Sequence, residues 1–354
     1  MKDSILRLNK DGNILRGVID KNIKSIVIPN SVIKIEHEAF AGCTELQSVI
    51  IPNSVTSIGH SAFYGCTSIQ SIDIPNSVTI IGDAAFMGCN ALKSINIPKS
   101  VITIGNSAFA LCSALQSIII PNSVTSIGNG AFHSCNTLQS IVVPRSVTKL
   151  GEGAFYRCTA LKSIDILSSI TSIEYETFYC CESLRDFIIP SSVTTIGYQA
   201  FFGCASLMTI DMPNTISILG AGAFEGCLAL QSVKISNALH IIAEEVFKEC
   251  TALVKIEMPD SVKNIGKAAF WGCKTLQSIE FNNITTIGEG AFTGCTALES
   301  IVIPESVTTI GRNAFASCTA LKSIFIPKTI VNVGKDVFFG CHLQKWENDC
   351  ESIM

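Results

Sequence analysis

Residues 46–66 read LQSVIIPNSVTSIGHSAFYGC, and close copies of this stretch follow one another along almost the whole chain. One phenylalanine recurs in fourteen copies, with every step 23 residues long except the 22-residue step from Phe270 to Phe292. A period of about 20 to 50 residues is typical of a solenoid, in which no unit buries its apolar face without its neighbours. The sequence therefore predicts stacked turns, which commonly serve as extended binding surfaces.

The recurring phenylalanine defines the register of the repeats. Its members are Phe40, Phe63, Phe86, Phe109, Phe132, Phe155, Phe178, Phe201, Phe224, Phe247, Phe270, Phe292, Phe315 and Phe338. A cysteine follows each of them by three positions, from Cys43 to Cys341. Positions that occupy the same place in every repeat can therefore be compared as columns, and the columns are expected to lie side by side in the fold.

The first half of each repeat predicts two extended segments. Val49 and Ile51 alternate with polar or variable residues, as in a half-buried strand. Pro52 lacks an amide donor and should end the strand there, and all eleven prolines of the chain hold this column. The hydroxyl of Ser54 is expected to bond nearby backbone. Val55 and Ile58 then form a second short segment that faces inward.

The second half of each repeat is predicted as one short helical turn. Residues 61–66 read SAFYGC, in which Phe63 should fill the interior and Cys66 should close it. Gly59, in a column that eleven of fourteen repeats keep, indicates a backbone position where a side chain would hinder the fold.

The repeat also sets the expected organisation of the chain. Residues 23–341 are predicted to form fourteen repeats of about 23 residues. Residues 1–22 are predicted as an N-terminal cap, where Asp11-Gly12 favours a hairpin turn. Residues 342–354 are predicted as a C-terminal cap or tail, because Gln344 stands where a leucine is expected.

Composition excludes several classes of partner. Hydrophobic residues make up 47% of the 354 residues, yet no run approaches the about 18 apolar residues of a membrane span. The net charge is only −4 and no basic stretch stands out, so nucleic acid is not an expected partner. Residues 1–10 show no secretory signal, because charges interrupt the apolar core that one requires. Localisation stays open between a cytosolic protein and a chain without its targeting segments.

The sixteen cysteines indicate buried thiols more than disulfides, and disulfides more than a metal site. Fourteen occupy one column, and only Cys180 and Cys350 lie outside it. A column of one small, weakly polar residue is well explained by packing, since free cysteine is among the most buried residue types. No CxxC or HxxxH spacing occurs. No nucleophile, phosphate-binding or zinc-protease motif is present and the five histidines are scattered, so we expect no enzyme, cofactor or metal.

The unit L-x-x-I-x-I-P-x-S-V-T-x-I-G-x-x-A-F-x-G-C resembles the BspA-like class of leucine-rich repeats over roughly residues 23–341. This resemblance implies an α/β repeat solenoid, an arc with a parallel sheet on its concave side and short helical turns on the other. It also implies a surface or secreted protein that adheres to extracellular-matrix or plasma proteins, host cells or other microbes. The class shares no catalytic residues, so the resemblance assigns none here.

Function is expected in the outward, variable columns, because packing explains the inward ones. The column after the inward strand residue is the main candidate for partner contact. Its members are Val27, Ile50, Asp73, Asn96, Ile119, Val142, Asp165, Ile188, Asp211, Lys234, Glu257, Glu280, Val302 and Phe325. Exposed apolar residues rimmed by charge are a usual interface composition. The alternative is ordinary β-propensity at a solvent face.

A secondary candidate follows the core phenylalanine. Tyr156, Tyr179 and Phe202 hold this column in consecutive repeats and are expected to form an aromatic strip. Aromatic side chains are common interface anchors. The alternative is that they pack between neighbouring turns.

Taken together, the sequence predicts a non-catalytic protein-binding repeat scaffold, with adhesion as the leading use. An intracellular interaction scaffold or regulator is one alternative, and a structural, self-associating repeat protein is another. The sequence leaves the partner and the oligomeric state open.

Overall fold

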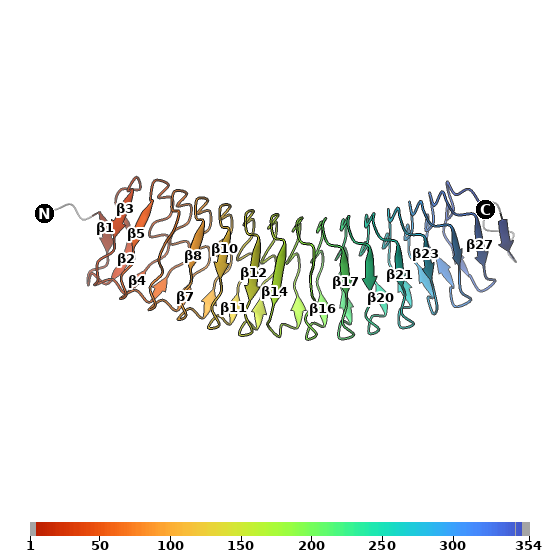
Figure 1. Cartoon of the computed structure of the whole chain (residues 1–354), viewed down its shortest axis with the longest axis horizontal. Coiled ribbons are helices and arrows are strands. Elements are labelled where there is room, and N and C mark those ends of the chain that lie inside the picture. The colour runs from red at the N-terminus through yellow and green to blue at the C-terminus, as the bar shows by residue number, and fades with distance from the viewer. Residues whose placement is uncertain (1–4, 344, 349–354) are drawn as a thin grey trace. The chain divides into compact units, whose positions relative to one another are not determined.

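The structure is a computed structural model that describes residues 5–343 and 345–348. It divides into unit 1, which comprises Met1–Ile170 and Cys180–Glu182, and unit 2, which comprises Thr171–Tyr179 and Ser183–Met354. Each unit is a solenoid of stacked turns built from short parallel strands, as the repeat predicts (Figure 1).

Each turn carries strands in two layers. The first-layer strands of unit 1 are β3 (Ser25–Val27), β5 (Ser48–Ile50), β8 (Ser94–Asn96), β10 (Ser117–Ile119), β12 (Ser140–Val143) and β14 (Ser163–Ile166). Those of unit 2 are β17 (Thr209–Asp211), β19 (Ser232–Lys234), β21 (Lys255–Glu257), β23 (Ser278–Glu280), β25 (Ser300–Val302), β27 (Ser323–Ile326) and β29 (Lys345–Asn348). The first layer ends at the proline column, where the amide donor is missing.

The second layer follows the proline in each turn. In unit 1 it contains β2 (Ile14–Val18), β4 (Lys34–Ile35), β6 (Ser57–Ile58), β7 (Ile80–Ile81), β9 (Thr103–Ile104), β11 (Ser126–Ile127) and β13 (Lys149–Leu150). In unit 2 it contains β15 (Ser172–Ile173), β16 (Thr195–Ile196), β18 (Ile218–Leu219), β20 (Ile241–Ile242), β22 (Asn264–Ile265), β24 (Thr286–Ile287), β26 (Thr309–Ile310) and β28 (Asn332–Val333).

The pairing register follows the repeat length. Ser140 pairs with Ser163 and Val142 with Asp165, each 23 positions apart. The pair Asn264–Thr286 is 22 positions apart, because the one short repeat lies between its members. Each column of the sequence is therefore a physical column within its unit.

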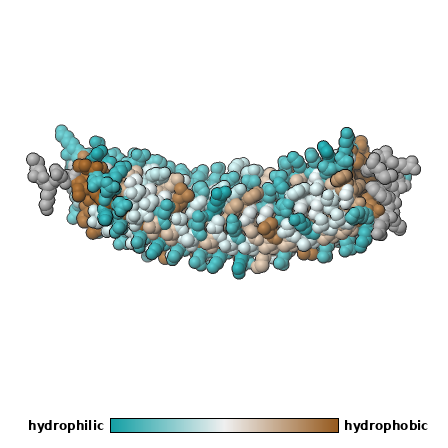
Figure 2. All heavy atoms as spheres, turned by 90° about the horizontal axis from the view of Figure 1, so that it is seen from above, coloured by the Kyte–Doolittle hydropathy of each residue, from teal (hydrophilic) through white to brown (hydrophobic). Residues whose placement is uncertain are grey.

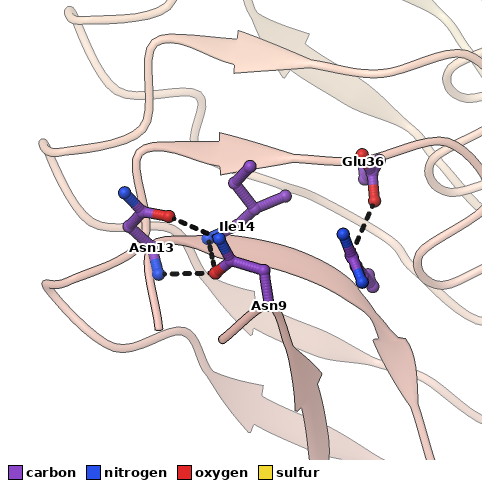
Figure 3. A network of polar contacts seen from close by, with 5 residues as sticks. Asn9, Asn13, Ile14 and Glu36 are labelled. Carbon is purple, nitrogen blue, oxygen red and sulfur yellow. Dashed lines mark hydrogen bonds and ion pairs between the residues drawn. The ribbon is translucent and has the colours of Figure 1, made fainter. Parts of the chain in front are cut away.

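An antiparallel hairpin precedes the second layer of unit 1. Strand β1 (Leu6–Leu8) pairs with β2, which in turn pairs in parallel with β4. The side-chain Oδ1 of Asn9 accepts hydrogen bonds from the amides of Asn13 and Ile14, both at 2.9 Å (Figure 3). Arg16 Nε lies 3.4 Å from a carboxylate oxygen of Glu36 in the first full turn. The Asn9 hydrogen bonds hold the hairpin turn itself, and the Arg16–Glu36 ion pair and the β2–β4 pairing attach the hairpin to the repeats.

The C-terminal segment adds one more strand. β29 pairs in parallel with β27 and extends the first layer of unit 2 by one position beyond the last core phenylalanine. The predicted interruption of the repeat at Gln344 lies outside the described residues, as does Cys350.

The core of each unit is a stack of phenylalanine rings, all buried except that of Phe338, which is half-buried. In unit 1 the ring centroids of successive members from Phe40 to Phe155 are 5.0 to 5.6 Å apart, with interplanar angles of at most 8°. Unit 2 repeats this stack from Phe178 to Phe338 at 5.1 to 5.8 Å. A phenylalanine inside the stack is buried because the rings of the preceding and following turns cover its two faces.

The predicted short helical turn is wrong, because no helix occurs among the residues that the structure describes. The amides of Ser61, Phe63 and Gly65 donate to carbonyl oxygens of the next turn at 2.7 to 2.8 Å, whereas the amides between them donate to the residue three positions earlier. Ser61 and Gly65 have φ values of 50° and 67°. Since left-handed residues interrupt the backbone every four positions, no helical i to i−4 ladder can form.

The recurrence of glycine at Gly59 and at the equivalent position of most other repeats has a steric cause. A Cβ atom added at Gly128 would lie 2.5 Å from the backbone nitrogen of Asn106 in the preceding turn. This column therefore needs glycine because two turns approach closely, and not because of a left-handed backbone.

Ser54 illustrates how the turns are also joined by side chains. Its hydroxyl donates to the carbonyl oxygen of Val32 at 2.6 Å, and Ser100 makes the same bond to Val78 at 2.6 Å. The expected hydroxyl-to-backbone bond is present in these repeats, where it links one turn to the turn before it, but the buried hydroxyls of Ser123, Ser146 and Ser261 in the same column make no hydrogen bond.

Candidate protein-binding surface

The solvent-facing side of the first-layer strands, here called the strand face, carries the main predicted column. Within β10, Ser117 and Ile119 are exposed while Ile118 between them is buried. The same exposed–buried–exposed pattern holds in β5, β8, β12, β17, β19, β21, β23 and β25. Strand alternation therefore brings one small serine column and one variable column to the same surface.

In unit 1 the strand face has two apolar places. Val27 of β3 pairs with Ile50 of β5, and both are exposed. Ile119 of β10 and Val142 of the adjacent β12 are 78% and 46% exposed. Asp73 and Asn96, which pair with each other through an isolated parallel β-bridge, lie between these two apolar places.

In unit 2 the strand face is charged in its middle and apolar beyond it. Asp211, Lys234, Glu257 and Glu280 follow one another in register on β17, β19, β21 and β23. Lys255 forms an ion pair with Glu257 on its own strand at 3.2 Å.

The apolar members of unit 2 are Ile188, which is 86% exposed, and the paired residues Val302 and Phe325. Much of the apolar surface of these side chains lies in water, and a contact that covered it would be favourable. Figure 2 shows hydrophobic residues as separate patches within a largely hydrophilic surface.

Loop residues beyond the strands add shallow hollows that sequence reasoning missed. One hollow in unit 1 is lined by Asn96, Pro98, Lys99, Ile119, Asn122 and Ser123. A second, in unit 2, is lined by Asp211, Lys234, Glu257, Asp260, Glu280 and Asn282, among others. The column directly after the proline supplies Lys99, Asn122 and Asp260. The polar composition of this column was the feature of the sequence from which the hollows could have been predicted.

The secondary aromatic candidate lies on another side of the turn. In unit 2 the rings of Tyr179 and Phe202 stack 4.6 Å apart at 6°. In unit 1 Tyr156 contacts the His133 ring at 4.9 Å and lies 5.6 Å from the guanidinium carbon of Arg157. All are half-buried, as expected of side chains that pack between turns. Burial, with the nearby Arg157 charge, lowers the pKa of His133.

The cysteine column lies inside the solenoid. Thirteen of its fourteen members are buried and Cys341 is half-buried, and all are free thiols. The thiol of Cys66 donates to the carbonyl oxygen of Phe40 one turn earlier at 3.2 Å, and the equivalent bond recurs along the column. Burial raises the pKa of the Cys112 thiol to about 12. A buried thiol such as that of Cys112 therefore stays protonated at neutral pH, whereas the thiolate is the form that reacts or binds metal.

Comparison with known proteins agrees with this architecture. The family described as BspA type leucine-rich repeat region matches residues 19–139, 102–231 and 217–345. The chain belongs to this family. A leucine-rich repeat protein from Bacteroides ovatus is 31% identical, with a TM-score of 0.77, over 96% of this chain and 91% of that one. A leucine-rich cell surface protein from Faecalibacterium prausnitzii is 29% identical, with a TM-score of 0.54, over 97% and 93%. The curated proteins give no match.

Leucine-rich repeat proteins of this type are typically non-catalytic and typically bind proteins. In the described part of the BspA-type chain, no three His, Cys, Asp or Glu side chains are placed to hold a metal ion. Nor do residues 5–343 and 345–348 include a helix that could cross a membrane.

Proposed function

We propose that this BspA-type solenoid is a non-catalytic scaffold that binds a protein partner through its strand face, in adhesion to host or extracellular-matrix proteins or to other cells. The observation that carries the proposal is the exposure of Ile119 in unit 1 and of Ile188 and Val302 in unit 2, each in the outward column of its turn. A contact that removes these side chains from water stabilises the complex by roughly 25 cal/mol for each Å² of apolar area.

The serine column supports close approach of the partner. Serines occupy the neighbouring exposed position in most first-layer strands, for example Ser94, Ser117 and Ser140. A short side chain leaves room for a partner backbone beside the larger apolar residues. Each turn adds a similar small contact, so avidity for a partner that engages several turns grows with the number of turns.

Adhesion is supported by the relatives as well as by the surface. The Faecalibacterium prausnitzii protein, which matches over nearly the whole chain, is a cell surface protein. Within each unit the repeats offer similar small contacts turn after turn, which suits attachment to a large matrix protein.

The experiment is a binding assay of the intact chain on immobilised extracellular-matrix and plasma proteins. The test variant carries Ile119→Lys, Val142→Lys and Phe325→Lys. The matched control carries Ile80→Lys and Ile218→Lys, which are 50% and 57% exposed but lie on the second layer. Saturable binding that the test variant loses and the control keeps supports the proposal. Equal binding by both variants rejects the strand face.

A second candidate is an interaction scaffold in a reducing compartment, favoured by the free thiols of the cysteine column. Buried thiols need no oxidising environment to pack, and disulfides are rare in the cytosol. Capture of a partner only from lysate of the source cell, with no binding to matrix proteins, would favour this use over adhesion. Assembly that depends on protein concentration would instead favour a self-associating role.

A further inference from the structure

The apolar pair Ile119 and Val142 is flanked by positive charge. Lys93 directly precedes β8 and Lys99 follows it, Arg145 follows β12, and Lys162 precedes β14. All four side chains are exposed. The pair and these four residues are here called the basic-rimmed patch, and all of it lies within unit 1.

The cations of this patch have no acidic partner within the described residues. None of the six ion pairs of those residues includes Lys93, Lys99, Arg145 or Lys162. Lys162 donates only to the side-chain oxygen of Gln139, at 3.4 Å. The nearby carboxylates are Asp165, beside Val142, and Asp73, beside Asn96. Four cations thus face two carboxylates.

The hollow beside β8 and β10 joins the apolar and basic parts. Lys99 and Ile119 line the same hollow, together with the amide side chains of Asn96 and Asn122. An ammonium group and two amide donors beside an exposed isoleucine can receive a carboxylate and an apolar side chain from one ligand.

The exposed apolar pair of unit 2, Val302 and Phe325, lacks this charge pattern. Glu299 and Glu305 hold, around β25, the positions that Lys93 and Lys99 hold around β8. Lys322 precedes β27, so the rim of Val302 and Phe325 is mixed. The pair Val302 and Phe325 therefore serves as an internal control. It shares apolar exposure with Ile119 and Val142 but lacks their unpaired positive rim.

We propose that the basic-rimmed patch binds an extended acidic segment of the partner, one that places carboxylates on Lys99 and Arg145 and an apolar side chain on Ile119 and Val142. This inference rests on the proposed function and names the chemistry of its partner. The four strands from β8 to β14 span roughly 14 Å at about 4.8 Å per strand, which about five extended residues cover.

The test uses the full chain and fluorescent peptides of about ten residues, or about 33 Å when extended. The acidic peptide carries glutamates around central leucines, and matched peptides carry lysine or glutamine in place of glutamate. Fluorescence anisotropy should give at least about tenfold tighter binding of the acidic peptide than of either control peptide, weakening as salt is added.

Variants then locate the site. Lys99→Glu with Arg145→Glu should weaken the acidic peptide about tenfold or more, and Ile119→Ser should weaken it as well. Lys322→Glu, in unit 2, should leave binding within about twofold of the wild type. Circular dichroism should confirm that each variant keeps the strand signal.

Three results would overturn the inference. The acidic and basic peptides bind equally, no peptide binds, or Lys99→Glu with Arg145→Glu leaves binding of the acidic peptide unchanged. Its failure is distinguishable from failure of the proposed function. Loss of matrix-protein binding in the strand-face variant, without selectivity for the acidic peptide, would keep the binding face and reject the acidic ligand. If the chain selects the acidic peptide but the strand-face variant still binds matrix proteins, the acidic ligand is kept and the strand face is rejected as the matrix-binding surface.

Discussion

Replacement of Phe109 by alanine tests how the solenoid is held together. Phe109 is fully buried, and its ring lies 5.5 Å from that of Phe86 and 5.6 Å from that of Phe132. Truncation of a buried phenylalanine costs about 3 to 5 kcal/mol, through lost transfer free energy and the cavity left behind. Because both stacked neighbours lose a contact, we expect a value near the middle of this range, about 4 kcal/mol.

The assay is urea unfolding followed by far-UV circular dichroism, with Phe339→Ala as the matched control. Phe339 is the same residue type but is 69% exposed, so its truncation should change the free energy of unfolding by no more than about 0.5 kcal/mol. In a repeat array each unit is stabilised by its neighbours, so a loss at Phe109 weakens two interfaces. A cost below about 1 kcal/mol at Phe109, or similar costs for both variants, would refute the stacked core.

Three further predictions follow from the backbone and the thiols. In the native protein an alkylating reagent should label the half-buried Cys180 and Cys341 quickly and the thirteen buried cysteines of the column only after unfolding; rapid labelling of most thiols would contradict their burial. Burial raises the pKa of Cys112 to about 12. At a pH above the ordinary pKa of a thiol, this cysteine therefore loses its proton in the unfolded chain and keeps it in the folded chain. The free energy of unfolding, measured over about pH 8 to 11, should fall as the pH rises. Gly128→Ala should cost about 3 kcal/mol, because its Cβ would meet backbone at 2.5 Å, whereas Gly130→Ala, with a φ of 59° and open space to 3.4 Å, should cost only about 1 kcal/mol in the same urea assay.

Much of the fold could be predicted because the 23-residue period repeats the same information in every turn. Phe63, Cys66 and Val49 recur in register, so their inward positions follow from spacing alone. The proline column was equally informative. Where Leu167 replaces proline, its amide donates to the carbonyl oxygen of Val143 at 3.0 Å, although β14 ends at the same column as β12 and β27, which proline follows.

The helical turn could not be excluded from sequence, because its backbone depends on hydrogen bonds between turns. The left-handed positions hold glycine in some repeats, such as Gly65, but Arg157 and Glu249 in others, with φ values of 56° and 58°. Nothing local marks those residues as left-handed. They adopt that conformation because the amides of the segment then reach the carbonyl oxygens of the adjacent turn.

The candidate surface divides in the same way. Exposure of Ile119 and Val142 followed from strand alternation, since adjacent residues of a strand face opposite sides and each of these two follows a buried isoleucine. The hollow beside Lys99 did not follow, because it depends on how the loop after each proline lies over the strand end. Which part of the strand face meets a partner is set by those loops, and remains a prediction.

Hydroxyl-radical footprinting of the chain, free and bound to a captured matrix protein, tests the central claim most directly. The account predicts that Ile119, Val142 and Phe325 become protected on binding, while the equally accessible Ile80 and Ile218 of the second layer keep their rates of oxidation. Protection confined to the second layer, or to the Tyr179 and Phe202 side, with the strand face unchanged, would contradict it.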